Sequence, residues 1–256
     1  MRPIVAVLVA VMVASGCSRF RDDGSEEVLD ASTSGSGDAA AEGAADAAAP
    51  DAADAGEGGG SGTTGTLQLP PDTTKEASSA NTSPFGGAGQ RFQSVYARTL
   101  LSALPKGAIL KAIRFRLDGD QPAFAKEDLD NLEIRLSTSK NAPGALSTSF
   151  AANRGLDEVI VRAGRFAIDP ADYPAGKKPN PFGKPIAFQR DFVYNGGDLL
   201  LEIGATALTS GRNVDNVSPL PSKEGQSVYG NGFSAAVATG TPFFDLIVVE
   251  FTFEYP

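Results

Sequence analysis

The sequence predicts an all-β fold, an antiparallel and jelly-roll-like β-sandwich, preceded by a signal peptide and a long acidic linker. From about residue 85, short apolar runs alternate with polar residues at a period of two, and turn residues separate the runs. Helical periodicity is scarce in the same region. The clearest alternation lies in 132–136 and 247–255, so we expect strands there with one buried face and one wet face.

The first sixteen residues have the pattern of a secretory signal peptide. Arg2 precedes an apolar run from Ile4 to Val13, and small residues follow it. This run is too short for a membrane span, which needs about 20 apolar residues. Residues 14–17 (ASGC) resemble the lipobox of bacterial lipoproteins, which implies cleavage before Cys17 and lipid on that cysteine. By the same resemblance, Ser18 after the cysteine implies an outer-membrane address.

An acidic linker is expected over 17–84, with the sandwich over 85–256. Residues 22–66 contain seven Asp, four Glu and no Lys or Arg, and few of them are bulky and apolar. Such a segment cannot bury enough surface to offset chain entropy, so we expect a disordered tether that holds the sandwich away from the lipid. Residues 60–65 match G-x-G-x-x-G, but a polar run precedes them and no helix follows, so they are interpreted as linker.

Individual elements follow from the same patterns. We expect strands near 92–96, 113–117, 132–136, 159–161, 185–188, 199–203, 233–237 and 247–255. Single helical turns are expected at 126–129 and 147–153. Asn195-Gly196 predicts a hairpin, because both residues tolerate positive φ.

The composition excludes several kinds of catalysis and several partners. The chain has no His and one Cys, which excludes a Ser-His-Asp triad, an imidazole metal site and a thiolate zinc site. We predict no catalytic residue and no cofactor. Residues 67–256 hold 19 basic and 20 acidic residues, so no nucleic-acid partner is expected. Ser137 and Lys140 match S-x-x-K, but they end an expected strand rather than begin a helix.

Four aspartates form the densest acidic set of the expected sandwich: Asp118, Asp120, Asp128 and Asp130. Asp is common in turns and caps, which is the simplest interpretation. The same carboxylates are also weak candidates for a Ca²⁺ site, although their spacing fits no EF-hand loop. A carboxylate pair for glycoside hydrolysis is the third alternative.

Other polar and aromatic residues lie on or near the expected strands. Arg114, Arg116, Glu133 and Arg135 are expected on wet faces, where they either pair across strands or form an anion or glycan patch. Four tyrosines are potential sugar-stacking platforms or ordinary half-buried residues: Tyr96, Tyr173, Tyr194 and Tyr229.

The order of several strand motifs resembles a known class of ectodomain. The motifs are RFQSVY (91–96), IRFR (113–116), LEIRLSTS (132–139) and LIVVEFTF (246–253). They resemble the extracellular β-sandwiches of PEP-CTERM and choice-of-anchor proteins, over about residues 90–256. The resemblance implies a secreted surface domain with no known catalytic residue. Because the sequence lacks a C-terminal Pro-Glu-Pro motif, Cys17 is the expected anchor.

Together these patterns predict a lipid-anchored protein of the cell envelope, at the outer-membrane surface or its periplasmic face. We expect a non-catalytic sandwich that binds an extracellular glycan or protein or has a structural role. The alternatives are a polysaccharide-acting envelope hydrolase with two carboxylates and a Ca²⁺-stabilised adhesion module.

Overall fold

The structure is a computed structural model, and it describes residues 62–71, 79–174 and 178–256. The described chain is nearly all β, with antiparallel ladders throughout, which confirms the predicted sandwich. The signal peptide, Cys17 and most of the predicted linker lie outside the described residues. Within the described ranges, no helix reaches the length and hydrophobicity that a membrane span requires.

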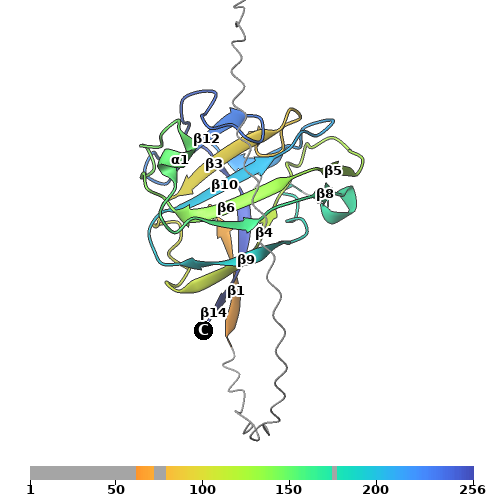
Figure 1. Cartoon of the computed structure of the whole chain (residues 1–256). Coiled ribbons are helices and arrows are strands. Elements are labelled where there is room, and N and C mark those ends of the chain that lie inside the picture. Colours follow the sequence, from red (N-terminus) through yellow and green to blue (C-terminus); the bar gives the residue numbers. More distant parts are fainter. Residues whose placement is uncertain (1–61, 72–78, 175–177) are drawn as a thin grey trace, which may run out of the picture. The chain divides into compact units, whose positions relative to one another are not determined.

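Two larger sheets pack face to face and form the sandwich (Figure 1). The four-stranded sheet has the order β1 (Thr63–Leu69), β14 (Val249–Tyr255), β4 (Ala108–Phe115) and β9 (Ile186–Tyr194). The five-stranded sheet has the order β12 (Gly225–Asn231), β3 (Gln90–Tyr96), β10 (Leu199–Ala205), β6 (Leu132–Thr138) and β7 (Val159–Arg162). The edge strands β7 and β9 lie beside each other, so the two sheets approach closely along one side.

Smaller elements complete the ends of the sandwich. They are a sheet of β13 (Leu246–Ile247), β11 (Val214–Val217) and β2 (Ser79–Asn81), a pair of β5 (Glu127–Leu129) and β8 (Phe166–Ile168), the helical turn α1 (Phe150–Asn153) and the 3-10 turn η1 (Pro170–Asp172). In Figure 1, α1 lies at one end of the five-stranded sheet and β5 and β8 lie at the other. Because α1 spans Phe150–Asn153, the predicted helical turn at 147–153 is confirmed.

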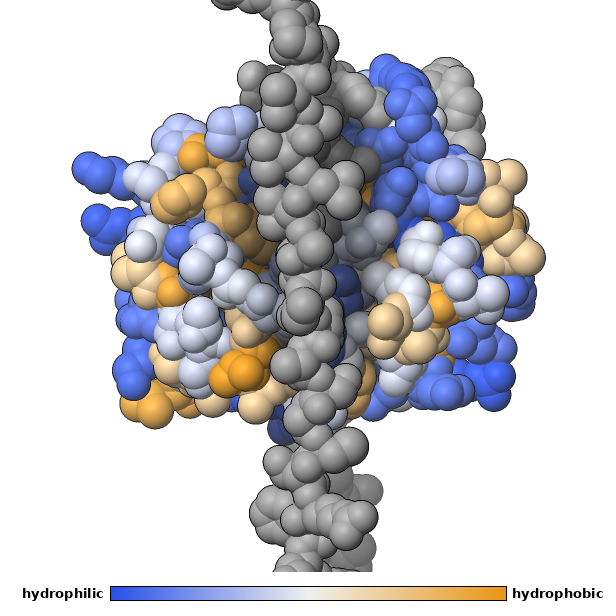
Figure 2. All heavy atoms as spheres, turned by 90° about the horizontal axis from the view of Figure 1, so that it is seen from above, coloured by the Kyte–Doolittle hydropathy of each residue, from blue (hydrophilic) through white to orange (hydrophobic). Residues whose placement is uncertain are grey.

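The core lies between the two larger sheets and is built by alternate residues of each strand. Ile113 and Phe115 of β4, Phe251 of β14 and Leu201 and Ile203 of β10 belong to one core cluster, and all five are at most 1% exposed. Burial of such apolar surface is the main favourable term in folding. On the outer surface seen in Figure 2, patches of hydrophobic residues are interspersed with hydrophilic ones.

Strand β10 is buried on both of its faces. Every residue from Leu199 to Ala205 is buried, because the outer face of the sheet is covered too. A second apolar cluster there consists of Val95, Leu146, Phe150, Leu200 and Val228. A strand buried on both sides needs no polar alternation, which explains the continuous Leu199-Leu-Leu run.

The predicted boundary between linker and sandwich is wrong, because the sandwich begins at Thr63 rather than at residue 85. Strand β1 pairs along its whole length with β14. Leu67 and Leu69 enter the core, and Gly65 lies opposite Phe253, whose ring covers it so closely that a Cβ would meet Phe253 Cζ at 2.5 Å. Aromatic cover of an edge glycine compensates for its weak strand preference.

Three other local predictions are also corrected. Residues 233–237 form a loop rather than a strand, and 126–129 contribute the strand β5 rather than a helical turn. Asn195-Gly196 joins β9 to β10, which belong to different sheets, so it is a crossover turn and not a hairpin. Gly196 has a φ of 92°, so the turn needs the glycine, but turn chemistry does not specify which sheet the next strand joins.

We predict that Leu69→Ala lowers the free energy of unfolding by about 2–5 kcal/mol, because it removes a fully buried side chain and leaves a cavity. Urea denaturation of the two chains measures the difference. Thr66→Ala, on the exposed face of the same strand, is the matched control and should change stability by about 0.5 kcal/mol or less. An equally small effect for Leu69→Ala would mean that β1 is not part of the cooperative unit.

Candidate functional site

The four aspartates singled out from the sequence do not gather into one site. The Asp118 carboxylate accepts a hydrogen bond from the Asp120 backbone N–H at 2.8 Å, as in an Asx turn. Asp128 pairs with Arg165 at 2.8 Å, and Asp130 is exposed. Among the described residues, no group of three or more acidic side chains could hold a metal ion. The calcium site therefore remains a prediction without geometric support.

The S-x-x-K motif lies at the end of a strand, as expected. Ser137 is buried in β6, and its hydroxyl accepts a hydrogen bond from the Gly155 N–H at 3.2 Å. Lys140 is exposed in the following loop. The serine is therefore not at the start of a helix with the lysine one turn further on, the geometry that Ser-Lys acyl transfer requires.

Two of the four residues expected on wet faces behave differently from each other. Arg114 pairs across β4 and β14 with Glu250 at 3.2 Å, as cross-strand pairing predicts. Arg116 is only 3% exposed and pairs with the buried carboxylate of Asp215. The expectation of a wet face is thus wrong for Arg116, because the chain after β4 turns toward β11, where Asp215 lies.

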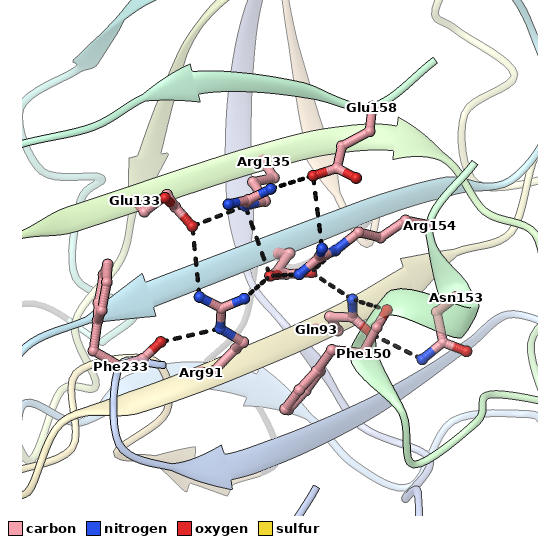
Figure 3. A network of polar contacts seen from close by, with 10 residues as sticks. Arg91, Gln93, Glu133, Arg135, Phe150, Asn153, Arg154, Glu158 and Phe233 are labelled. Atoms are coloured by element: carbon pink, nitrogen blue, oxygen red, sulfur yellow. Dashed lines mark hydrogen bonds and ion pairs between the residues drawn. The ribbon is translucent and has the colours of Figure 1, made fainter. Parts of the chain in front are cut away.

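Glu133 and Arg135 belong to a larger arginine–glutamate cluster on the outer face of the five-stranded sheet (Figure 3). The cluster comprises Arg91, Arg135, Arg154, Glu133, Glu158 and Glu202. Glu202 of β10 is its centre, with a side chain that is 2% exposed. Arg91 Nη1 donates to Glu202 Oε1 at 3.0 Å, and Arg154 donates two bonds to the same carboxylate at 2.6 and 2.7 Å.

The cluster is electrically balanced and also fixes the cover of the sheet. It holds three guanidinium groups and three carboxylates, and its hydrogen bonds to Glu202 raise the pKa of Arg154. Gln93 donates to Glu202 at 2.6 Å and to the Phe150 carbonyl at 3.0 Å, so it links the cluster to α1. Because these guanidinium groups already contact carboxylates, the structure gives no support to an anion patch at Arg135.

We predict that Glu202→Gln lowers the free energy of unfolding by about 3–5 kcal/mol, because it removes the buried carboxylate that partly buried guanidinium groups share. Thermal and urea denaturation measure the change. Glu254→Gln is the control, since its side chain is 50% exposed and its pair with Lys111 should contribute about 1 kcal/mol or less. Comparable effects for the two substitutions would contradict a central role for Glu202.

Two hollows adjoin at Tyr173, at the end of the sandwich that carries β5 and β8; we call them together the Tyr173 cleft. The first has a volume of about 320 Å³, and its walls include Lys126, Phe166, Asp169, Asp172, Tyr173 and Lys184. The second has a volume of about 210 Å³, and its walls include Gln121, Pro122, Phe124, Pro170, Tyr173 and Asn180. Because η1 contributes residues to both, it forms a ridge between them.

Tyr173 follows η1 directly and is 8% exposed. Its ring lies against Gly183, where a Cβ would meet Tyr173 Cδ1 at 2.5 Å, so the glycine allows the ring its position. Burial, and to a lesser extent the negative charge of Asp172, raises the pKa of Tyr173, so its phenol stays neutral at physiological pH. Among the described residues the Tyr173 hydroxyl has no hydrogen-bond partner, which leaves it able to donate and accept.

Phe124 is held in the second hollow by a buried arginine. The Arg212 guanidinium carbon lies 4.3 Å from the centre of the Phe124 ring, within the range of a cation–π contact. Arg212 is 1% exposed, pairs with Glu127 of β5 and donates to the Ser210 carbonyl at 2.6 Å. The aromatic wall of this hollow therefore has a rigid support.

The first hollow is lined by two ion pairs. Lys126 Nζ lies 3.5 Å from Asp169 Oδ2, and Lys184 Nζ lies 3.6 Å from Asp172 Oδ1. Asp169 caps η1 by accepting a hydrogen bond from the Ala171 N–H, which lowers the pKa of Asp169. A general acid for glycoside hydrolysis needs a raised pKa, so the lowered pKa of Asp169 gives no support to the hydrolase alternative.

Asn180 brings a buried amide to the second hollow. Its Nδ2 donates to the carbonyls of Leu117 and Asp118, each at 3.1 Å, and this fixes the orientation of the amide. Its Oδ1 is buried and accepts no hydrogen bond from the described chain. The amide is therefore held inside the wall of the hollow by its two donated bonds.

Sequence reasoning found only part of this cleft. It named Tyr173 as a platform, but it did not single out Phe124, Asn180 or Asp169. The Asp169-Pro170 pair was an available signal, because Asp before Pro is typical of a helix start. The acidic turn at 118–120 borders the second hollow through Gly119. None of the four predicted aspartates lines either hollow.

Comparisons with protein families, with curated proteins and with solved structures found no match for this chain.

Proposed function

We propose that this chain is a lipid-anchored surface protein of the cell envelope, at the outer-membrane surface or its periplasmic face, and that its sandwich binds an extracellular glycan or protein at the Tyr173 cleft. The observation that carries the binding role is the cleft itself, two hollows with aromatic, proline and charged walls that share Tyr173, whose hydroxyl has no hydrogen-bond partner in the described chain. Apolar walls with a few convergent polar groups are typical of ligand sites in proteins.

The anchor is supported by the sequence. Cys17 is the chain's only cysteine and follows the apolar leader at the position where lipidation requires it. Several acyl chains hold a protein firmly, because each buried methylene contributes about 0.8 kcal/mol. The resemblance of the strand motifs to PEP-CTERM and choice-of-anchor ectodomains also supports a surface location.

We expect that Cys17→Ser abolishes metabolic labelling with palmitate and leaves the leader uncleaved, because it removes the sulfur whose acylation precedes cleavage. Labelling and the mass of the protein from cells that produce either chain measure this. Ser36→Ala, in the acidic segment, should behave like the unchanged chain. Palmitate incorporation that survives in the Cys17→Ser chain would rule out this anchor.

A second expectation concerns the binding role. The mature chain, made soluble by Cys17→Ser, should bind at least one ligand on arrays of glycans and proteins, and Gly183→Ala should weaken that binding at least ~10-fold. The added Cβ forces the Tyr173 ring out of place. Gly240→Ala is the control, since a Cβ there meets nothing within 4 Å. Circular dichroism checks that both chains fold. Arrays without any ligand sensitive to Gly183→Ala would leave the sandwich with a structural role only.

A further inference from the structure

From the walls of the Tyr173 cleft we infer that its ligand is a neutral oligosaccharide that spans η1, with one sugar residue in each hollow. This inference rests on the proposed binding function and specifies its ligand class. It combines three observations: the pair of hollows that share Tyr173, the mixed donors and acceptors of the first, and the aromatic and proline walls of the second.

The dimensions of the cleft favour a ligand built of small repeated units. Typical sites for larger ligands have volumes of about 300–1,000 Å³. The first hollow measures about 320 Å³, at the lower end of that range, and the second measures about 210 Å³, below it. Because Asp169 and Asp172 face one hollow and Pro170 faces the other, a ligand that fills both must cross the ridge of η1.

The charges of the first hollow favour hydroxyl groups. Two ion pairs bring two ammonium groups and two carboxylates to this hollow, and both lysine side chains are more than 60% exposed. A charged ligand would meet one group of like sign for each group of opposite sign. A hydroxyl donates to a carboxylate and accepts from an ammonium, so a neutral polyol satisfies both members of each pair.

The second hollow has apolar aromatic and proline walls beside the buried amide of Asn180. Phe124, Pro122 and Pro170 present faces against which the C–H side of a sugar ring can pack, and Arg212 holds the Phe124 ring in place. Asn180 is 95% buried, its Nδ2 is used by two carbonyls, and its Oδ1 lacks a donor. The Asn180 amide is therefore fixed in the wall of this hollow, and the apolar faces are what the hollow offers to a sugar ring.

The test titrates the Cys17→Ser mature chain with neutral cello-, malto- and chito-oligosaccharides, each graded from monosaccharide to hexasaccharide, by calorimetry. At least one series should bind, and its disaccharide or trisaccharide should bind ~10-fold or more tightly than the monosaccharide, with a plateau beyond, because two connected subsites are filled together. Equal affinity for all lengths, or no binding in any series at millimolar concentration, would overturn the inference.

Two substitutions test the two hollows separately. Asp172→Asn removes an acceptor from the first, and Phe124→Ala removes the aromatic wall of the second; each should reduce oligosaccharide affinity to about that of the monosaccharide. Asp191→Asn, which breaks a comparable lysine pair at 3.0 Å, and Phe244→Ala, which removes another partly exposed ring, are the matched controls. Melting temperatures identify any variant that fails to fold. If one of the two variants does not fold, the oligosaccharide affinity of the variant in the other hollow tests the inference.

The outcomes separate this inference from the proposed function. Preferential binding of sulfated or uronic-acid glycans that weakens with salt would overturn the neutral ligand and leave a binding role in place. A protein ligand that is lost in Gly183→Ala would do the same. Only the absence of every cleft-dependent ligand would remove both.

Discussion

The carboxylate of Glu202 imposes the strongest single constraint on the sandwich. It projects from the middle strand of the five-stranded sheet on the side away from the main core, and it is almost completely buried. A buried charge requires opposite charges and hydrogen bonds around it, or its desolvation is not offset. Arg91 comes from the neighbouring strand and Arg154 from the loop after α1, so the covering loop must fold back onto the sheet to supply the second guanidinium.

The sequence could predict strands that show alternation, but not an edge strand that depends on its partner. Strands with one wet face, such as β6 and β14, can be recognised because apolar and polar residues alternate along them, and both were expected. Strand β1 could not be recognised, because its Thr- and Gly-rich sequence becomes a strand only through Phe253 and Phe251 of a partner far along the chain. Tertiary contacts override local preference in such edge strands.

The candidate site follows the same division. Tyr173 was recognisable because aromatic residues among turn residues stand out in a sequence. The partners that give it a cleft come from two connections far apart in sequence, one between β4 and β5 and the other between β8 and β9. No spacing rule brings Phe124 and Asn180 together, and the support of Phe124 by Arg212 depends on a contact 88 positions away in the chain. The turn at 118–120 was singled out for its aspartates, but the residue of this turn that lines the cleft is Gly119.

The register of β1 against β14 also has a mechanical consequence. Thr63, where the described chain enters the sandwich, lies opposite Tyr255, while β14 joins the rest of the domain at Val249, at the other end of the ladder. A pull on Thr63 along the strand therefore acts in shear, and the 7 residue pairs carry the load together instead of opening one after another. The first strand of the described domain is therefore held most firmly against a force that acts along its own axis.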